Sequence, residues 1–99
     1  MSHFRYYPGR GGARYLLDVQ SSQLERLATR VVIPLVPLGE RFSDIADLNP
    51  LLVVEEERLV MMTSLIASVP RRALGAPLGN LLDQSDDITR ALGILLNGF

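Results

Sequence analysis

Residues 85–99, SDDITRALGILLNGF, hold the most regular pattern in the chain and decide how its fold is interpreted. Apolar side chains recur there with i, i+3, i+4, i+7 and i+8 spacing, at Ile88, Ala91, Leu92, Leu95 and Leu96. That spacing forms one stripe of an α-helix. Ser85 is expected to cap the helix, the two aspartates after it complement the helix dipole, and Gly98 is expected to end it. The segment therefore predicts an amphipathic helix that packs on another part of the protein.

The residues before this helix are arranged as short strands separated by turns. The glycine-rich segment 8–12 is the strongest turn signal, and the three glutamates 55–57 indicate a solvated hairpin tip. Pro34 cannot donate a ladder hydrogen bond, so its strand should end, bulge or lie at an edge there. Strands are predicted at residues 4–7, 15–20, 30–35, 51–54 and 58–62, and a further short apolar segment at 63–69.

Many strands followed by one terminal helix predict a mainly β, α+β fold. We expect a small antiparallel sheet or SH3-like barrel with a long C-terminal helix packed on it. At 99 residues the chain is expected to form a single domain, residues 1–99. A domain of this size buries only about 60–65% of the surface of its unfolded chain. Since 47% of the residues are hydrophobic, part of that apolar surface should be covered by a second copy, which predicts a homodimer.

Composition argues against several classes of protein. The net charge is −1, without the basic excess that proteins use to neutralise phosphates, so no direct contact with nucleic acid is expected. The N-terminal residues lack the apolar region of a signal peptide. No apolar run reaches the roughly 18 residues of a membrane span. We therefore expect a cytoplasmic protein without a membrane segment.

The chain is poor in residues that carry out chemistry. It has no cysteine, and His3 is its single histidine, so neither a metal site nor a histidine-activated nucleophile is expected. The glutamates 55–57 and the aspartates at the helix start are explained by a solvated turn and a helix terminus. These observations favour a binding protein that has no cofactor and is not an enzyme.

Three stretches resemble the CcdB toxin family. The first is residues 14–21, RYLLDVQS, followed by VIPL at residues 32–35. The second is MMT at residues 61–63, followed by ASVP at residues 67–70. The third is the C-terminal helix with Asp87, Ile88 and Ala91, which closes on Gly98 and Phe99. Their order and spacing cover the chain from about residue 6 to its last residue.

The resemblance implies a toxin of a type II toxin–antitoxin system. Such toxins are homodimers that bind the A subunit of DNA gyrase and trap the complex with cleaved DNA. A cognate, CcdA-like antitoxin with a disordered tail removes the toxin from gyrase. No cofactor or metal takes part.

Family position also implies two sets of site residues. The gyrase-binding set is Gln23, Leu24, Ser85, Asp86, Arg90, Gly93, Leu96, Asn97, Gly98 and Phe99. The antitoxin-binding set is Gly9, Arg10, Gly11, Arg14, Arg41, Phe42, Ser43 and Asp44.

Departures from the family pattern keep two alternatives open. The family has Trp where this chain has Asn97, Asn where it has Gly93, and a pair of Ile where it has Gln23 and Leu24. These changes allow a CcdB-like fold with a different target, or a non-toxic decoy for the antitoxin. The similar fold of the mRNA-cleaving Kid and MazF toxins suggests the other alternative, an endoribonuclease. Its site would use Arg14, Arg30 and Asp18.

Overall fold

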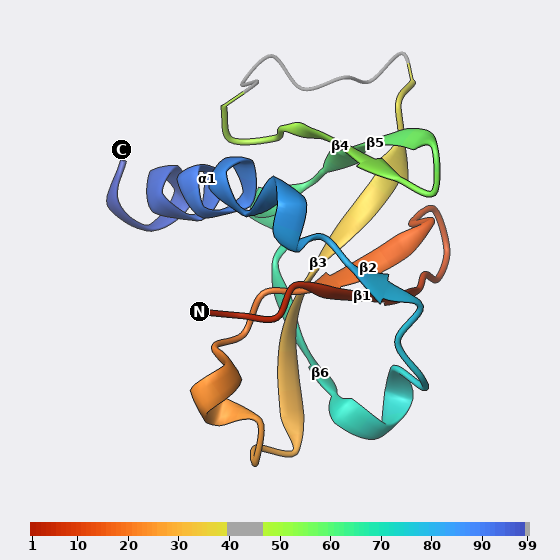
Figure 1. Cartoon of the computed structure of the whole chain (residues 1–99), viewed down its shortest axis with the longest axis vertical. Coiled ribbons are helices and arrows are strands. Elements are labelled where there is room, and N and C mark those ends of the chain that lie inside the picture. The colour runs from red at the N-terminus through yellow and green to blue at the C-terminus, as the bar shows by residue number, and fades with distance from the viewer. Residues whose placement is uncertain (40–46, 99) are drawn as a thin grey trace.

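Strand β3 (Thr29–Pro37) is the centre of the fold, because three other strands pair with it. The computed structural model describes residues 1–39 and 47–98. Along one side of β3 lies β2 (Tyr15–Asp18). Along the other side, β6 (Ala67–Pro70) pairs with the first half of β3 and β5 (Glu57–Met61) with its end. A strand that changes partners in this way lets the sheet curl instead of remaining flat (Figure 1).

The remaining strands extend the sheet at both ends. Strand β1 (Arg5–Pro8) pairs with β2, and the two-residue β7 (Gly79–Asn80) pairs with β1. At the other end β4 (Leu51–Val54) forms a hairpin with β5. The order is β4-β5-β3-β2-β1-β7 with β6 beside β3, and every pairing is antiparallel. Together with helix α1 (Ser85–Asn97), this confirms the predicted mainly β, α+β fold.

Pro34 does not end its strand, so of the three predicted possibilities, an end, a bulge or an edge, the first is wrong. Strand β3 continues through Pro34 to Pro37. On the side away from β2, residues 29–32 pair with β6 and residues 35–37 with β5, so Pro34 lies where the partner changes. Its carbonyl accepts a hydrogen bond from the N–H of Met62 at 3.0 Å. A missing N–H is tolerated here because the ladder is interrupted at this point.

The strands alternate between two apolar layers, as a period of two residues requires. Tyr6 and Ile33 face the main core, while their neighbours Tyr7 and Val32 face a smaller cluster with Leu74. Helix α1 covers the main core through Ile88 and Ala91, which are fully buried. The other members of the main core are Phe4, Leu17, Leu35, Leu52, Val54, Leu59, Met61 and Leu81.

The start of α1 differs from the prediction. The N-cap residue is Gln84 rather than Ser85, and its side chain does not cap the helix. A 3₁₀ turn, Leu82–Gln84, leads directly into α1, and the N–H of Ser85 bonds to Leu82 within it. The Gln84 amide instead contacts β4, where its Nε2 donates to the Val53 carbonyl and its Oε1 accepts from the Val53 N–H, both at 2.8 Å. Ser85 was a plausible cap by residue type, but a long-range contact fixes the helix start.

The end of α1 and the β4–β5 turn lie where the sequence indicated. Gly98 has φ +80° and donates to the Ile94 carbonyl at 2.9 Å, which ends the helix. Glu55 and Glu56 form the hairpin turn with φ of +50° and +70°. Positive φ at both central residues belongs to the two-residue turn that suits strand twist, although Asn-Gly usually fills it. None of the helices in the described ranges is long and apolar enough to cross a bilayer.

Candidate functional site

The C-terminal half of α1 extends beyond the core that holds its first half. Ile88 and Ala91 are buried, the residues from Leu92 to Leu95 are half-buried, and Asn97 and Gly98 are exposed. Leu96 is 74% exposed. The apolar stripe predicted from the sequence therefore has two parts. Its first half packs on the sheet, Leu92 still contacts the edge of the main core, and only Leu96 at its end is largely exposed.

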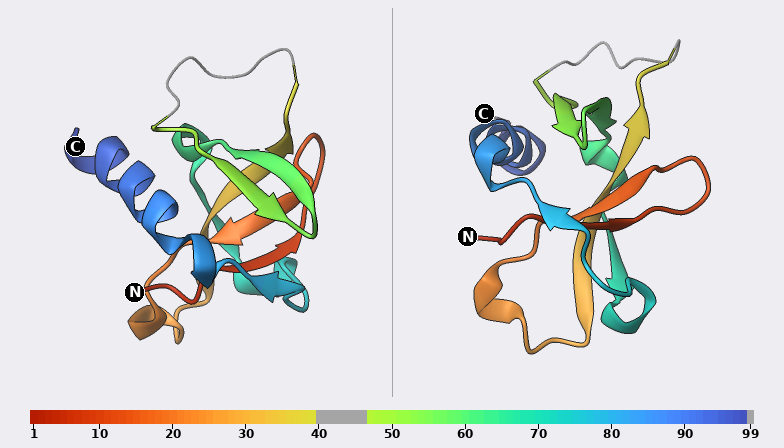
Figure 2. Two further views of the ribbon diagram at one scale, coloured as in Figure 1. Left: turned by 45° about the horizontal axis from the view of Figure 1, so that its top comes forward. Right: turned by 45° about the vertical axis from the view of Figure 1, so that its right-hand side comes forward.

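The loop that carries Gln23 and Leu24 lies on the same side of the molecule as the end of α1 (Figures 1 and 2). Both residues belong to a 3₁₀ turn, Ser22–Leu24, and both are exposed. Leu24 has 48% of its surface in solvent. The structure therefore places these two predicted residues on the side where the helix ends.

An apolar hollow of about 270 Å³ lies between α1 and the N-terminal segment. Its lining is Met1, Ser2, Phe4, Val19, Ser21, Thr89 and Leu92. The buried ring of Phe4 reaches this position through a backbone with φ +48°, which is unusual for a bulky residue. The prediction missed this hollow, although the helical stripe contains Leu92. No local pattern indicated that the first residues of the chain approach the last helix.

Three other predicted residues lie away from the end of α1. Ser85 and Asp86 are in its first turn, and at 1.5 Å per residue Ser85 is roughly 16 Å from Leu96 along the helix. Arg90 is exposed and pairs with Asp87 at 3.3 Å, one turn along the helix surface. Gly93 is half-buried in the middle of the exposed half. Phe99 lies outside the described residues.

Four of the predicted antitoxin-binding residues, Gly9, Arg10, Gly11 and Arg14, lie on the opposite side of the molecule, in the loop between β1 and β2 (Figures 1 and 2). Gly9 must be glycine, because a Cβ there would lie 2.2 Å from the Ala13 carbonyl oxygen. Gly11 has φ +60°. Arg10 donates to the Ala73 carbonyl at 2.6 Å, and Arg14 pairs with a carboxylate of β5 at 3.3 Å. Arg14 thus attaches the loop to the sheet, and Arg10 attaches it to the 3₁₀ turn Arg71–Ala73.

An open apolar groove of about 480 Å³ adjoins this loop. It is lined by Gly12, Val36, Pro37, Gly39, Val60, Met62 and Leu65. Met61, the last residue of β5, is buried, whereas the adjacent Met62 lines the groove. The predicted residues Arg41, Phe42, Ser43 and Asp44 lie outside the described residues.

Comparison of the chain with models of known protein families shows which family has this fold. The family model described as CcdB protein matches residues 3–98, nearly the whole chain. This chain belongs to the CcdB family. The match confirms the resemblance drawn from the three short motifs. CcdB proteins are toxins that poison gyrase rather than catalyse reactions, so the family suggests a gyrase-targeting toxin of a toxin–antitoxin system.

In this CcdB-family chain, the residues considered for RNA cleavage do not form one cluster. Arg14 bonds through its N–H to Leu35, and Arg30 lies five residues earlier on β3, roughly 16 Å along the strand. Arg30 and Asp18 do meet, with 3.6 Å between Nε and Oδ2, but both are buried. Burial raises the pKa of the Asp18 carboxyl, against the opposing effects of a hydrogen bond from the Gln20 N–H and the Arg30 charge. Within the described residues, no group of three His, Asp or Glu side chains is placed to hold a metal ion.

Proposed function

We propose that this protein is a toxin that binds the A subunit of DNA gyrase, traps the cleaved-DNA complex and is neutralised by a cognate antitoxin. The family match over residues 3–98 carries the proposal. The exposed side chain of Leu96, which follows the half-buried Ile94 and Leu95, supports it, because exposed apolar surface marks sites where proteins bind one another. We place this action in the cytoplasm, where gyrase and DNA meet.

The gyrase-binding surface consists of the end of α1 together with the Leu24 loop. Leu96 and Leu24 supply apolar side chains that a partner can bury, and the tip residues Asn97 and Gly98 are exposed beside Leu96. A few well-packed anchors supply most of the binding energy of such an interface. A protein that acts in this way needs shape and anchors, and no general acid or base.

The protein acts as a homodimer in this proposal. The half-buried positions Leu92, Ile94 and Leu95 are large apolar groups that a single copy leaves partly in water. A second copy would remove that surface from solvent and bring two helix ends close together. The antitoxin binds the other side, around Gly9, Arg10, Gly11 and Arg14, with the 480 Å³ groove available to apolar side chains of its tail. Residues 41–44, which family position adds to this set, lie outside the described residues.

A DNA-cleavage assay tests this function. The protein is incubated with gyrase from its own host, plasmid DNA and ATP, and linear DNA is sought after detergent and protease. Linear DNA is expected with the wild-type chain and lost with Gly98→Glu, because the αL glycine at the tip would be replaced by a charged side chain. The matched control is Leu78→Ala, an exposed position in the loop before β7 that should leave cleavage unchanged.

The alternative target is favoured by one observation, the polar Asn97 exposed at the tip where the family has Trp. If a folded dimer binds antitoxin yet produces no linear DNA, the chain is a decoy or acts on another protein. That result would contradict the gyrase proposal directly.

A further inference from the structure

The loop of residues 21–28, here called the target loop, has no apolar anchor in the core. All of its residues are exposed or half-buried. Backbone hydrogen bonds attach its two ends, from the Ser22 N–H to the Met1 carbonyl at 3.1 Å and from the Arg71 N–H to the Ala28 carbonyl at 2.8 Å. Between these ends the loop carries Gln23 and Leu24, so its shape decides where those side chains point.

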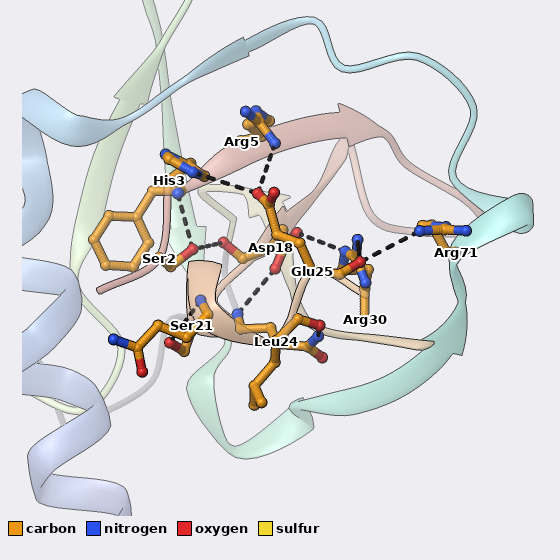
Figure 3. A network of polar contacts seen from close by, with 12 residues as sticks. Ser2, His3, Arg5, Asp18, Ser21, Leu24, Glu25, Arg30 and Arg71 are labelled. Carbon is orange, nitrogen blue, oxygen red and sulfur yellow. Dashed lines mark hydrogen bonds and ion pairs between the residues drawn. The ribbon is translucent and has the colours of Figure 1, made fainter. Parts of the chain in front are cut away.

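Side chains from the neighbouring strands hold the middle of the target loop (Figure 3). The Arg30 guanidinium donates from Nη2 to the Glu25 carbonyl at 2.7 Å and from Nη1 to the Leu27 carbonyl at 2.9 Å. The same Nη1 also bonds to the Thr29 carbonyl at 2.9 Å. One planar side chain therefore fixes three successive parts of the backbone.

Arg30 is itself held in place by Asp18. Its Nε lies 3.6 Å from Asp18 Oδ2, and each residue is only 8% exposed. The other Asp18 oxygen, Oδ1, accepts from the Gln20 N–H at 2.9 Å, and the Asp18 carbonyl accepts from the Ser2 hydroxyl at 2.9 Å. A buried pair bonded on every side has little freedom to move, so the guanidinium is a fixed support.

The other polar contacts of the loop are weaker or more local. Glu25 Oε1 lies 3.3 Å from both Arg5 Nη1 and His3 Nε2, and all three side chains are nearly half exposed, so solvent weakens these ion pairs. Arg71 reaches the Glu25 carbonyl at 3.3 Å in an exposed position. Gln20 bonds the Leu24 carbonyl at 2.9 Å. Arg30 is thus the buried side chain with the most bonds to the loop.

We propose that Arg30, seated on Asp18, is a positioning residue that holds the target loop in the shape that presents Leu24 to the target. This inference rests on the proposed function, since it assigns a role within the same surface. Ordering a loop costs conformational entropy, and a loop ordered before binding does not incur that cost on association. When only a fraction of molecules has a competent loop, the apparent Kd rises by the inverse of that fraction.

Arg30→Lys is the variant that tests this role. Lysine keeps the positive charge beside Asp18 but has a single ammonium, which cannot match the planar fork that reaches three carbonyls. Amide hydrogen exchange in residues 21–28 is expected to rise at least tenfold, with exchange in β2 and β3 unchanged. Gyrase binding should weaken about tenfold while antitoxin binding stays within twofold of wild type. Arg26→Lys is the matched control, because Arg26 is an exposed arginine of the same loop, and its exchange should not change.

The outcomes separate this proposal from the gyrase proposal. Exchange is measured on the protein alone, so failure of the wild-type chain to bind gyrase refutes the target and leaves the loop measurement standing. Unchanged loop exchange in Arg30→Lys would overturn the positioning role. The role would also be overturned if Arg30→Lys made the loop mobile but left the affinity for gyrase unchanged.

A measurement on the unaltered protein covers the case in which Arg30→Lys does not fold. In nuclear magnetic resonance spectra, the Arg30 guanidinium should show slow exchange with water and restricted rotation, while that of Arg26 should rotate freely. An Arg30 guanidinium as free as that of Arg26 would overturn the inference.

Discussion

Replacing Leu96 with alanine tests the gyrase-binding surface at the most exposed apolar side chain among its described residues. The change removes three carbon atoms, each worth about 0.8 kcal/mol when moved from water to an apolar environment. Because 74% of Leu96 is in solvent in the free protein, about three-quarters of that energy, or roughly 1.8 kcal/mol, remains to be gained on binding. The expected result is a Kd for gyrase weakened about 20-fold.

Calorimetric titration of wild type and Leu96→Ala into the gyrase A subunit measures this effect, and urea unfolding checks the fold. Since the side chain is mostly exposed, the free energy of unfolding should change by no more than about 0.5 kcal/mol. Sedimentation of both proteins at one concentration shows whether self-association is altered as well.

Leu78→Ala provides the matched control. Leu78 is 51% exposed and lies in the loop before β7, away from the end of α1. Its Kd should stay within twofold of wild type. The reasoning is refuted if Leu96→Ala also stays within twofold, or if Leu78→Ala weakens binding as strongly, because exposure of an apolar side chain would then carry no information about the surface.

Four further predictions concern stability. Ile88→Ala empties a fully buried site between α1 and the sheet and should lower the free energy of unfolding in urea by about 2–5 kcal/mol; a loss below 1 kcal/mol would mean that the helix is not docked there. Gly79→Ala places a Cβ 2.8 Å from the hydroxyl oxygen of the buried Tyr6, which should cost about 1–3 kcal/mol in the same measurement, and an unchanged value would contradict the observed contact. Glu56→Gly relieves a φ of +70° and should raise stability by about 0.5–1 kcal/mol after the entropy cost of glycine, seen as a higher Tm, whereas a lower Tm would show that the turn is unstrained. Burial, with a hydrogen bond to Glu55, raises the pKa of Tyr6 above its ordinary 10.0, so the folded state keeps this proton when the unfolded chain loses it. The contribution of Tyr6 to stability is therefore complete below about pH 10 and declines above it. The free energy of unfolding, measured from about pH 8 to 11, should fall less steeply with pH in Tyr6→Phe than in the wild type, and equal slopes would contradict this cause.

The sequence was sufficient for the elements that depend on local pattern. The stripe from Ile88 to Leu96 gave the helix, and Gly98 gave its end, because helix period and the αL conformation are properties of neighbouring residues. Strands β1 to β5 all overlap their predicted ranges, while β6 lies at the end of the segment 63–69, which was predicted only to be apolar. The glutamate turn was also found, since a run of like charges must lie in water.

Features that depend on contacts between residues far apart in the sequence could not be predicted from local patterns. Gln84 replaces Ser85 as the N-cap residue, and its side chain bonds a strand 31 residues away in sequence. Pro34 lies inside a strand because two different strands share one side of β3. Asp18 and Arg30 were considered only as residues of an RNA-cleaving site. Their role in supporting a loop could not be predicted, since a buried ion pair of this kind leaves no pattern in the residues next to either partner.

The bond between Gln84 and Val53 has a consequence for how this protein meets other chains. An edge strand exposes N–H and C=O groups on which a foreign strand can form, and this is a common route to aggregation. At Val53, in edge strand β4, both groups are already taken by one side-chain amide with the geometry of a peptide. The Gln84 side chain therefore occupies the position of a neighbouring strand at this one residue of the edge. The chain can expose Leu96 at the end of α1 for binding without also offering free backbone groups at Val53 for amyloid-like growth.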